Sequence, residues 1–205
     1  RLQNLIASYH PDRSDRVLLA AHYDSRPRAD RDTGTARDVP IPGANDGASG
    51  VAVLLEVAQA LAGWDPGLGV DLVFFDGEDY GREGDLEHYL LGSKHFVRTM
   101  LVDMVGERGM RIPMEGNSLQ SAPELTQLVF EVAAALGSSG FVREAGPALY
   151  DDHLPFLRVG IPAVDLIDFD YPAWHTAADL PAACSAASLG QVGALVWDLI
   201  RNPPE

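Results

Sequence analysis

The stretch VDLVFFDGEDYG, residues 70–81, joins an apolar run to a cluster of three carboxylates. The run over 70–76 is rich in apolar and β-branched residues, so it predicts a strand that is buried on both faces of a sheet. Asp76, Glu78 and Asp79 stand where that strand ends. In an arbitrary sequence a solvated turn would explain such acids. The other motifs of the chain decide between a turn and a functional site.

Four apolar, β-branched-rich runs predict strands, at 17–22, 70–76, 101–105 and 161–167. Apolar residues recur at helical spacing between and after these runs, over 51–61, 123–136 and 185–201, and shorter helices are expected over 92–100 and 151–160. Two polar segments, 25–43 and 80–91, predict loops. The alternation of strands and helices is typical of an α/β domain in which helices cover a sheet.

Length and composition limit the possible functions. With 205 residues, the chain is expected to form a single domain over 1–205. The formal net charge of −15 argues against nucleic acid or an anionic membrane surface as a partner, because both require basic patches. Cys184 is the only cysteine, which excludes an internal disulfide and a thiolate metal cluster. No apolar run approaches the ~18 residues of a membrane span. The chain begins with RLQNLIASYHPD, in the middle of a sequence pattern rather than at its start. We therefore expect that an N-terminal piece has been trimmed.

Polar clusters follow the ends of the predicted strands. They contain His22 and Asp24 in AHYDS, Asp46 in NDG, Glu78 and Asp79 in GEDYG, Asp103 in LVDMVG, and His175 in AWHT. In open α/β sheets, ligands bind beyond the carboxyl ends of the strands. Imidazole and carboxylate ligands that arrive from separate loops suit Zn²⁺. The sequence therefore predicts a metal site, although it offers no local signature of the HExxH kind.

Each of these residues also has a structural interpretation. His22 suits a core histidine, Asp46 suits a helix N-cap, and His175 suits simple packing beside Trp174. Asp103 fits such an interpretation least well, because a carboxylate buried in an apolar strand needs a partner. The remaining histidines stand in weaker contexts: His10, His88, His95 and His153.

The motif series resembles that of the zinc aminopeptidase-like superfamily, which includes the M28 metallopeptidases and the glutaminyl-peptide cyclotransferases. The motifs that carry the resemblance are AHYDS, IPGANDGASGVAVLLEVA, VFFDGEDYG, YLLGSKHF, LVDMVG, DDHLPFLRVGIPAVDLI and YPAWHT. Their order and spacing agree from about residue 15 to the C-terminus. The resemblance implies a three-layer α/β sandwich, in which a twisted, mixed, mostly parallel sheet has helices on both faces.

The resemblance also implies roles for individual residues. The ligands of one zinc ion would be Asp46, Asp79 and His175. Glu78 would be the general acid/base. In the two-metal peptidases a second ion would be bound by His22 and Asp103, with Asp46 as the bridge. The chain departs from the family pattern at Asp79, because the family usually has Glu there, and the ligand is one methylene shorter.

Two features favour a cyclase over a peptidase. Asp151 stands in DDH where the peptidases more often have Ser, and in the cyclases this acid hydrogen-bonds the catalytic carboxylates. Trp174 resembles the cyclase residue that lines the substrate pocket. A helix cap would also explain Asp151, and core packing would explain Trp174. We expect a cyclase with one zinc ion and keep two alternatives, an aminopeptidase with one or two zinc ions and an inactive binding module of the same fold.

The cyclase mechanism assigns proton transfer to Glu78, which would take a proton from the α-amine of an N-terminal glutamine and pass one to the departing ammonia. Burial and the nearby acids Asp103 and Asp151 would raise its pKa towards neutrality. The substrates implied are peptide or protein N-termini. The resemblance further implies a monomer and a secreted or periplasmic location, and we expect no nucleic-acid or membrane partner.

Overall fold

The computed structural model describes residues 2–81, 89–90 and 100–202. The helix expected over 92–100 lies outside the described residues except for its last residue, which begins a strand. His88 and His95 also lie outside them.

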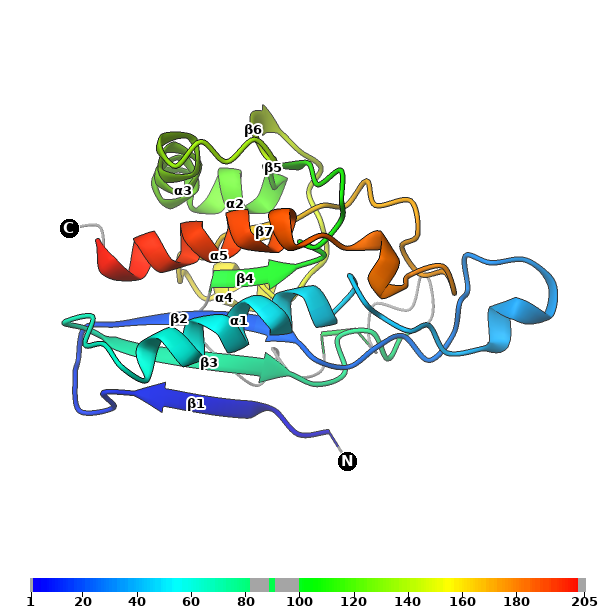
Figure 1. Cartoon of the computed structure of the whole chain (residues 1–205), viewed down its shortest axis with the longest axis horizontal. Helices are drawn as coiled ribbons and strands as arrows, with labels where there is room; N and C mark the ends of the chain where they lie inside the picture. The colour runs from blue at the N-terminus through cyan, green and yellow to red at the C-terminus, as the bar shows by residue number, and fades with distance from the viewer. Residues whose placement is uncertain (1, 82–88, 91–99, 203–205) are drawn as a thin grey trace.

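A five-stranded sheet forms the centre of the molecule, in the order β1-β3-β2-β4-β7 (Figure 1). Its strands, in chain order, are β1 (Leu5–Tyr9), β2 (Arg16–His22), β3 (Gly69–Phe75), β4 (Met100–Asp103) and β7 (Asp165–Ile167). The pairs of β2 with β3, β2 with β4, and β4 with β7 are parallel, whereas the edge strand β1 pairs with β3 antiparallel. The mixed, mostly parallel sheet that the resemblance implied is therefore confirmed.

Both faces of this sheet are buried, as the continuous apolar runs predict. Side chains alternate between the two faces of a strand. In β2, Leu19 and Ala21 join the larger core cluster, while Leu18 and Ala20 join a separate cluster on the other face. A strand of this kind needs apolar residues at every position, which explains why its sequence does not alternate.

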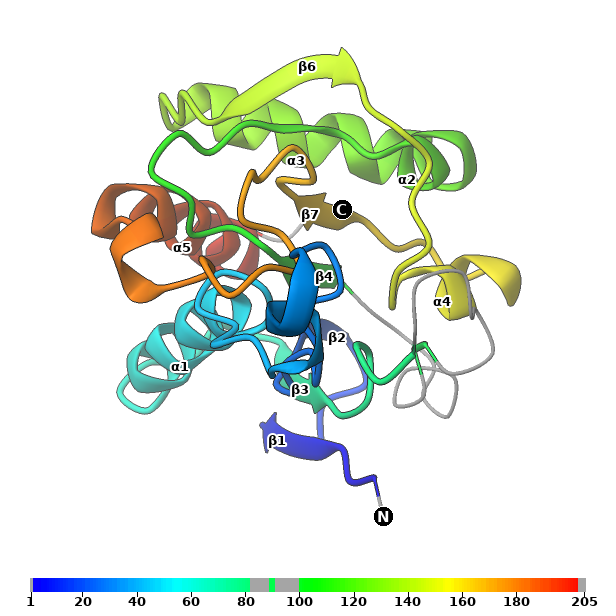
Figure 2. The ribbon, with the colours of Figure 1, turned by 90° about the vertical axis from the view of Figure 1, so that its right-hand side faces the viewer.

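Helices cover both faces (Figure 2). α1 (Ala48–Leu61) and α5 (Ala186–Arg201) pack together on one face, and the short α4 (Leu154–Arg158) covers the other with Phe156. Beyond the β7 edge lie further elements, namely α2 (Gly116–Ser121), α3 (Pro123–Ala135) and a two-stranded sheet of β5 (Ile112–Met114) and β6 (Phe141–Ala145). Two 3₁₀ turns, η1 (Gly34–Asp38) and η3 (Pro181–Ala183), lie in loops. Within the described residues, no helix is long and apolar enough to cross a membrane.

The elements differ from the sequence predictions mainly at their ends. The strand expected over 161–167 forms only over its last three residues. Pro162 has no N–H to donate to a neighbouring strand, and the amide of Ile161 instead donates to the carbonyl of Phe156 at the end of α4. The strand expected over 101–105 stops at Asp103, because Met104 adopts a left-handed φ of 47°. The sequence prediction missed β1, β5, β6 and α2, which are all six residues or shorter.

Helix α1 lies unusually close to the sheet at Gly50. A Cβ atom on this residue would overlap the carbonyl oxygen of Val102 and would stand 2.9 Å from the Cβ of Ala21. The close approach brings the start of α1, and the loop before it, against the carboxyl ends of β2 and β4.

We predict that Gly50→Ala destabilises the protein by at least about 2 kcal/mol, because the backbone carbonyl of Val102 cannot move aside without shifting β4. Gly193→Ala in α5 is the matched control, since a Cβ there meets nothing within 4 Å and should gain about 0.5–1 kcal/mol of helix stability. Urea unfolding of both variants measures the two effects. A Gly50→Ala variant as stable as the wild type would contradict the close packing.

Candidate functional site

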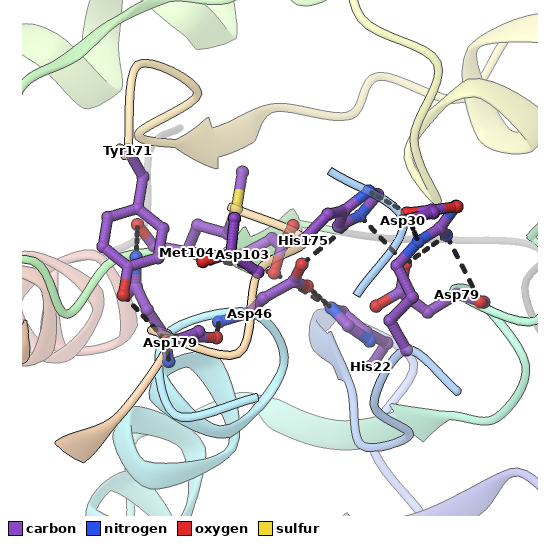
Figure 3. A network of polar contacts seen from close by, with 12 residues as sticks. His22, Asp30, Asp46, Asp79, Asp103, Met104, Tyr171, His175 and Asp179 are labelled. Carbon is purple, nitrogen blue, oxygen red and sulfur yellow. Dashed lines mark hydrogen bonds and ion pairs between the residues drawn. The ribbon is translucent and has the colours of Figure 1, made fainter. Parts of the chain in front are cut away.

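The polar residues from the strand ends converge at one edge of the sheet. His22 and Asp103 are the last residues of β2 and β4, and Asp79 lies in the loop after β3. Asp46 lies just before α1, and His175 lies in the loop after β7. Figure 3 shows these five side chains directed towards one another. The structure therefore brings together the polar residues that the sequence places at the ends of the predicted strands.

His22 lies between two carboxylates. Its Nε2 is 3.0 Å from Asp103 Oδ1 and 3.3 Å from Asp46 Oδ1. Burial alone would lower the pKa of His22, but Asp103, Asp24 and Asp46 together raise it well above its ordinary value. His22 is buried, as the structural interpretation expects, but its partners are acids rather than core residues.

His175 shares Asp46 with His22 and also lies beside Asp79. Its Nε2 is 3.5 Å from Asp46 Oδ2 and 3.3 Å from Asp79 Oδ1. The residue has a φ of 57°, a left-handed conformation that is uncommon outside glycine and that clusters at functional sites. Its ring also packs against Trp174, with centroids 4.2 Å apart.

These residues fit a metal ion. Single ligand atoms of His22, Asp46 and Asp79 lie within 4.8 Å of one another. Asp46 Oδ2 and Asp79 Oδ2 are buried and have no hydrogen-bond partner among the described residues, a costly state that a bound cation would relieve. One imidazole with two carboxylates is a donor set that suits Zn²⁺. This tight group contains His22 where the resemblance implied His175, although His175 also lies close to both acids.

A cavity of about 220 Å³ opens beside this group. Its acidic lining consists of Asp46, Glu78, Asp79, Asp103 and Asp151. Its remaining walls are mostly apolar or aromatic and include Tyr89, Met104, Leu149, Tyr150, Ile167, Phe169 and Trp174, with His175 beside them. Pockets for drug-sized ligands measure roughly 300–1,000 Å³, so this cavity suits a small group such as one terminal residue. All three acids predicted as catalytic, together with Trp174, therefore line one cavity.

Two of these acids hold their protons more tightly than usual. Burial, with the charge of Asp79, raises the pKa of Glu78 well above its ordinary value. Burial, with the charge of Asp103, raises the pKa of Asp151 to about 6. The raised pKa of Asp151 lets this carboxyl group exchange a proton close to neutral pH, and the raised pKa of Glu78 favours its protonated form.

The capping interpretations of Asp46 and Asp151 are wrong. The N-cap of α1 is Gly47, which has a φ of 93° and makes no side-chain cap. The N-cap of α4 is His153, and the Asp151 carboxylate accepts the amide of Asp152 instead. Both carboxylates therefore remain available to the cavity.

Two further aspartates fix the loops that carry the site. Asp24 accepts the amides of Glu78 and Asp79 at 3.2 and 3.1 Å. Asp179 accepts the amides of Asn45 and Asp46 at 2.9 and 3.1 Å. Sequence reasoning noted Asp24 only as a neighbour of His22 and missed Asp179, because a contact over more than 130 residues leaves no local pattern.

Sequence reasoning also missed Arg26 and Asp30, which lie in the segment 25–43 that was predicted to be a polar loop. Arg26 is fully buried and donates to both Asp30 and Asp79. The available signal was the opposite charge of residues 26 and 30, which is common in solvated loops.

A second buried ionic cluster supports the segment that carries Asp151. His153 Nε2 lies 3.1 Å from Glu115, and its Nδ1 lies 3.4 Å from Asp165. Glu115 also accepts the amide of Ser118 at the start of α2 and that of Leu149. Of these residues, the sequence analysis considered only His153, and it could not see the partners because they are separated along the chain.

Comparison with known proteins relates the chain to peptidases of family M28 and to glutaminyl cyclases. The model of peptidase family M28 matches residues 4–200. Glutaminyl-peptide cyclotransferase of Bos taurus is 26% identical over 223 residues, which cover 86% of this chain and 59% of that protein. The chain thus spans less than two thirds of the length of this curated relative.

Two solved structures resemble the chain closely. Tannerella forsythia glutaminyl cyclase has a TM-score of 0.94 and 36% identity, covering 99% of this chain and 79% of that one. A leucine aminopeptidase precursor from Bacteroides thetaiotaomicron has a TM-score of 0.92 and 35% identity, covering 98% and 77%. Similarity of structure alone therefore does not separate the two activities.

We predict that Glu115→Gln destabilises the protein at neutral pH. Burial would raise the pKa of Glu115, but His153 and backbone amides lower it from 4.5 to about 2, a difference worth roughly 3 kcal/mol. Because the folded-state pKa is depressed, this stabilisation is present above about pH 4.5 and is lost as the pH falls towards 2. Urea unfolding near pH 7 and near pH 4 measures the free energy of unfolding of both proteins. The difference between wild type and variant should be smaller at pH 4 than at pH 7. An equal gap at both pH values would contradict the ionised Glu115.

Proposed function

The chain belongs to peptidase family M28, and on that premise we propose that it is a zinc-dependent glutaminyl-peptide cyclotransferase. Such an enzyme converts the N-terminal glutamine of a peptide to pyroglutamate and releases ammonia. The observation that carries the proposal is the placement of Glu78, Asp103 and Asp151 in one small cavity. This cavity lies beside the metal-type cluster, the group of His22, Asp46 and Asp79 that could hold a metal ion. Cyclisation requires a proton to move within the substrate, and this cavity supplies acids for that transfer.

The cavity suits an N-terminal glutamine in charge and in shape. Its acidic lining attracts the positively charged amino terminus. Trp174 packs against Phe169 with ring centroids 4.5 Å apart, and both residues line the cavity. These rings form an apolar wall for the aliphatic part of the glutamine side chain. A core-packing role of Trp174 is compatible with the same contacts, because only one face of the ring has to meet the substrate.

The residues that would hold zinc are Asp46, Asp79 and His175, as the family resemblance implies, with His22 next to them. When bound there, zinc supplies a Lewis acid that polarises the γ-carbonyl of the glutamine. The donor atoms and the buried oxygens without hydrogen bonds support this assignment.

Proton transfer is assigned to Glu78. The α-amine nitrogen attacks the γ-carbonyl carbon, a C–N bond forms, and the bond to the side-chain amide nitrogen breaks. Glu78 accepts the proton that the amine loses and delivers it to the departing ammonia, so the number of protons is conserved. Asp103 and Asp151 line the same cavity. Burial and the charge of Asp103 raise the pKa of Asp151 to about 6, so Asp151 is placed to hold the proton that the charged amino terminus must lose before its nitrogen attacks.

The second candidate is an aminopeptidase that uses two zinc ions. It is favoured by the position of His22 between Asp46 and Asp103, at 3.3 and 3.0 Å. The resemblance to the two-metal peptidases implies that these residues would bind a second ion. In that case Glu78 would act as the base that activates water. An inactive binding module is the third candidate, and the complete set of acids in the cavity counts against it.

The proposed substrates are peptide or protein N-termini. We also propose that the protein acts as a monomer, in a secreted or periplasmic location, without nucleic-acid or membrane partners. The net charge of −15 supports the absence of anionic partners.

We predict that the metal-loaded protein releases ammonia from a glutamine-initiated peptide and contains about one zinc per chain. A leucine-initiated peptide of the same length is the control, and it should remain intact. Both assays and a zinc count are made on one purified sample. Release of free leucine with about two zinc ions per chain would replace the cyclase with the aminopeptidase.

We predict that Glu78→Gln lowers turnover of the glutamine peptide by at least about 100-fold while zinc stays bound, because the amide cannot transfer the proton. Glu56→Gln, on the exposed side of α1, is the matched control and should be as active as the wild type. Turnover and zinc content are measured for both variants. Activity within a few-fold of the wild type in Glu78→Gln would remove Glu78 from the mechanism.

A further inference from the structure

Arg26 is a fully buried cation beside the candidate metal ligands. Its guanidinium donates from Nε and Nη2 to the two oxygens of Asp30, at 2.9 and 2.6 Å. Its Nη1 donates to Asp79 Oδ1 at 3.1 Å. Burying a guanidinium is costly unless carboxylates pair with it and satisfy its hydrogen bonds. Arg26 is therefore held in place by two acids, one of which belongs to the metal-type cluster.

The geometry requires a planar, forked cation. Three nitrogens of one guanidinium bind two carboxylates that approach from different sides. The Tyr89 ring lies 5.2 Å from the guanidinium carbon and adds a cation–π contact. A lysine ammonium has the same charge but cannot present donors in a fixed plane. The arrangement thus depends on the shape of the guanidinium as well as on its charge.

This contact fixes the orientation of Asp79. Arg26 engages Oδ1, whereas Oδ2 is buried and has no hydrogen-bond partner among the described residues. The carboxylate cannot rotate about its χ2 bond without breaking the hydrogen bond to Arg26. One oxygen of Asp79 is consequently kept available for a ligand other than a protein donor.

The same segment reaches His175. Asp30 Oδ1 lies 3.8 Å from His175 Nδ1, on the side of the ring opposite the Nε2 atom that faces Asp46 and Asp79. The amide of Arg31 donates to the His175 carbonyl at 3.4 Å. One of these contacts holds the His175 carbonyl and the other lies beside its ring, so both stabilise the residue in its left-handed backbone conformation.

We propose that Arg26 is a positioning residue for the metal site. Its guanidinium aligns Asp79 directly and His175 through Asp30, so that both present the correct atom to a single ion. The inference rests on the part of the proposed function that places zinc at Asp46, Asp79 and His175, and it does not depend on which reaction the ion supports.

Charge and orientation act in opposite directions at this site. Removing a cation favours the binding of another cation, whereas releasing Asp79 and His175 disfavours it. Arg26→Lys separates the two effects, because the charge stays and the fork is lost. Arg28→Lys is the matched control, since Arg28 lies in the same loop and donates to the backbone carbonyls of Tyr80 and Gly81.

The experiment measures the zinc dissociation constant of metal-stripped protein by competition with a chromophoric chelator, in the absence of substrate. Arg26→Lys should bind zinc about 10- to 100-fold more weakly than the wild type, the range typical of residues that orient metal ligands. Arg28→Lys should stay within about two-fold of the wild type. Thermal unfolding without zinc shows that each variant is folded at the assay temperature, and a merely structural role would lower that midpoint without changing the zinc affinity of the folded protein.

Zinc binding by Arg26→Lys that equals or exceeds wild-type binding would overturn the proposal. If Arg26→Lys does not fold, Asp30→Asn decides, because it keeps the shape of the side chain and weakens both the fork and the contact to His175. Zinc affinity that is unchanged in Asp30→Asn would likewise overturn it. A wild-type protein that binds zinc but releases no ammonia from a glutamine peptide would refute the cyclase and leave the role of Arg26 intact.

Discussion

The site depends on the cost of burying many carboxylates together. Asp46, Asp79 and Asp103 are each at most 6% exposed and lie around one cavity. Two like charges 4 Å apart repel by about 4 kcal/mol at an effective dielectric constant of 20, so several ionised acids cannot coexist here without compensation. The described structure offers three kinds of compensation: imidazoles, a buried guanidinium, and protons on acids whose pKa values are raised. A bound metal ion would be a fourth, because it would meet the buried oxygens of Asp46 and Asp79 that lack hydrogen bonds among the described residues.

Compensation works only if the charged groups are held still, and the backbone does much of this. Asp24 and Asp179 each bind two consecutive amides and thereby fix the loops that carry Asp79 and Asp46. The parallel strands place the origins of these loops at one edge, and the close packing of α1 at Gly50 brings Asp46 to the same edge. Functional side chains on rigid elements with locked rotamers keep their geometry without a bound ligand.

The two candidate reactions use nearly the same residues in different states. In the proposed cyclase, Asp103 and Asp151 would lie beside Glu78 as acids of the cavity, whereas in a two-metal peptidase Asp103 would be a metal ligand together with His22. If either a proton or a second metal ion can offset the repulsion between these carboxylates, the same site can support either chemistry. This is consistent with the presence of both a glutaminyl cyclase and an aminopeptidase precursor among the structural relatives. The balance between these states is therefore the property that distinguishes the two functions.

The sequence by itself determined the α/β class, the three longest helices of the described residues, the buried core strands and the polar residues at their carboxyl ends. Those features are local: apolar period, strand propensity and the rule that ligands bind beyond strand ends. Only the tertiary structure decided the short elements β1, β5, β6 and α2, which gain their stability from partners distant in the chain. It also decided that Arg26, Asp30, Asp179 and the cluster of Glu115 with Asp165 belong to the site or support it. From sequence alone, a charged residue is expected to be exposed to solvent unless its partner is known. These partners meet only when the chain is folded.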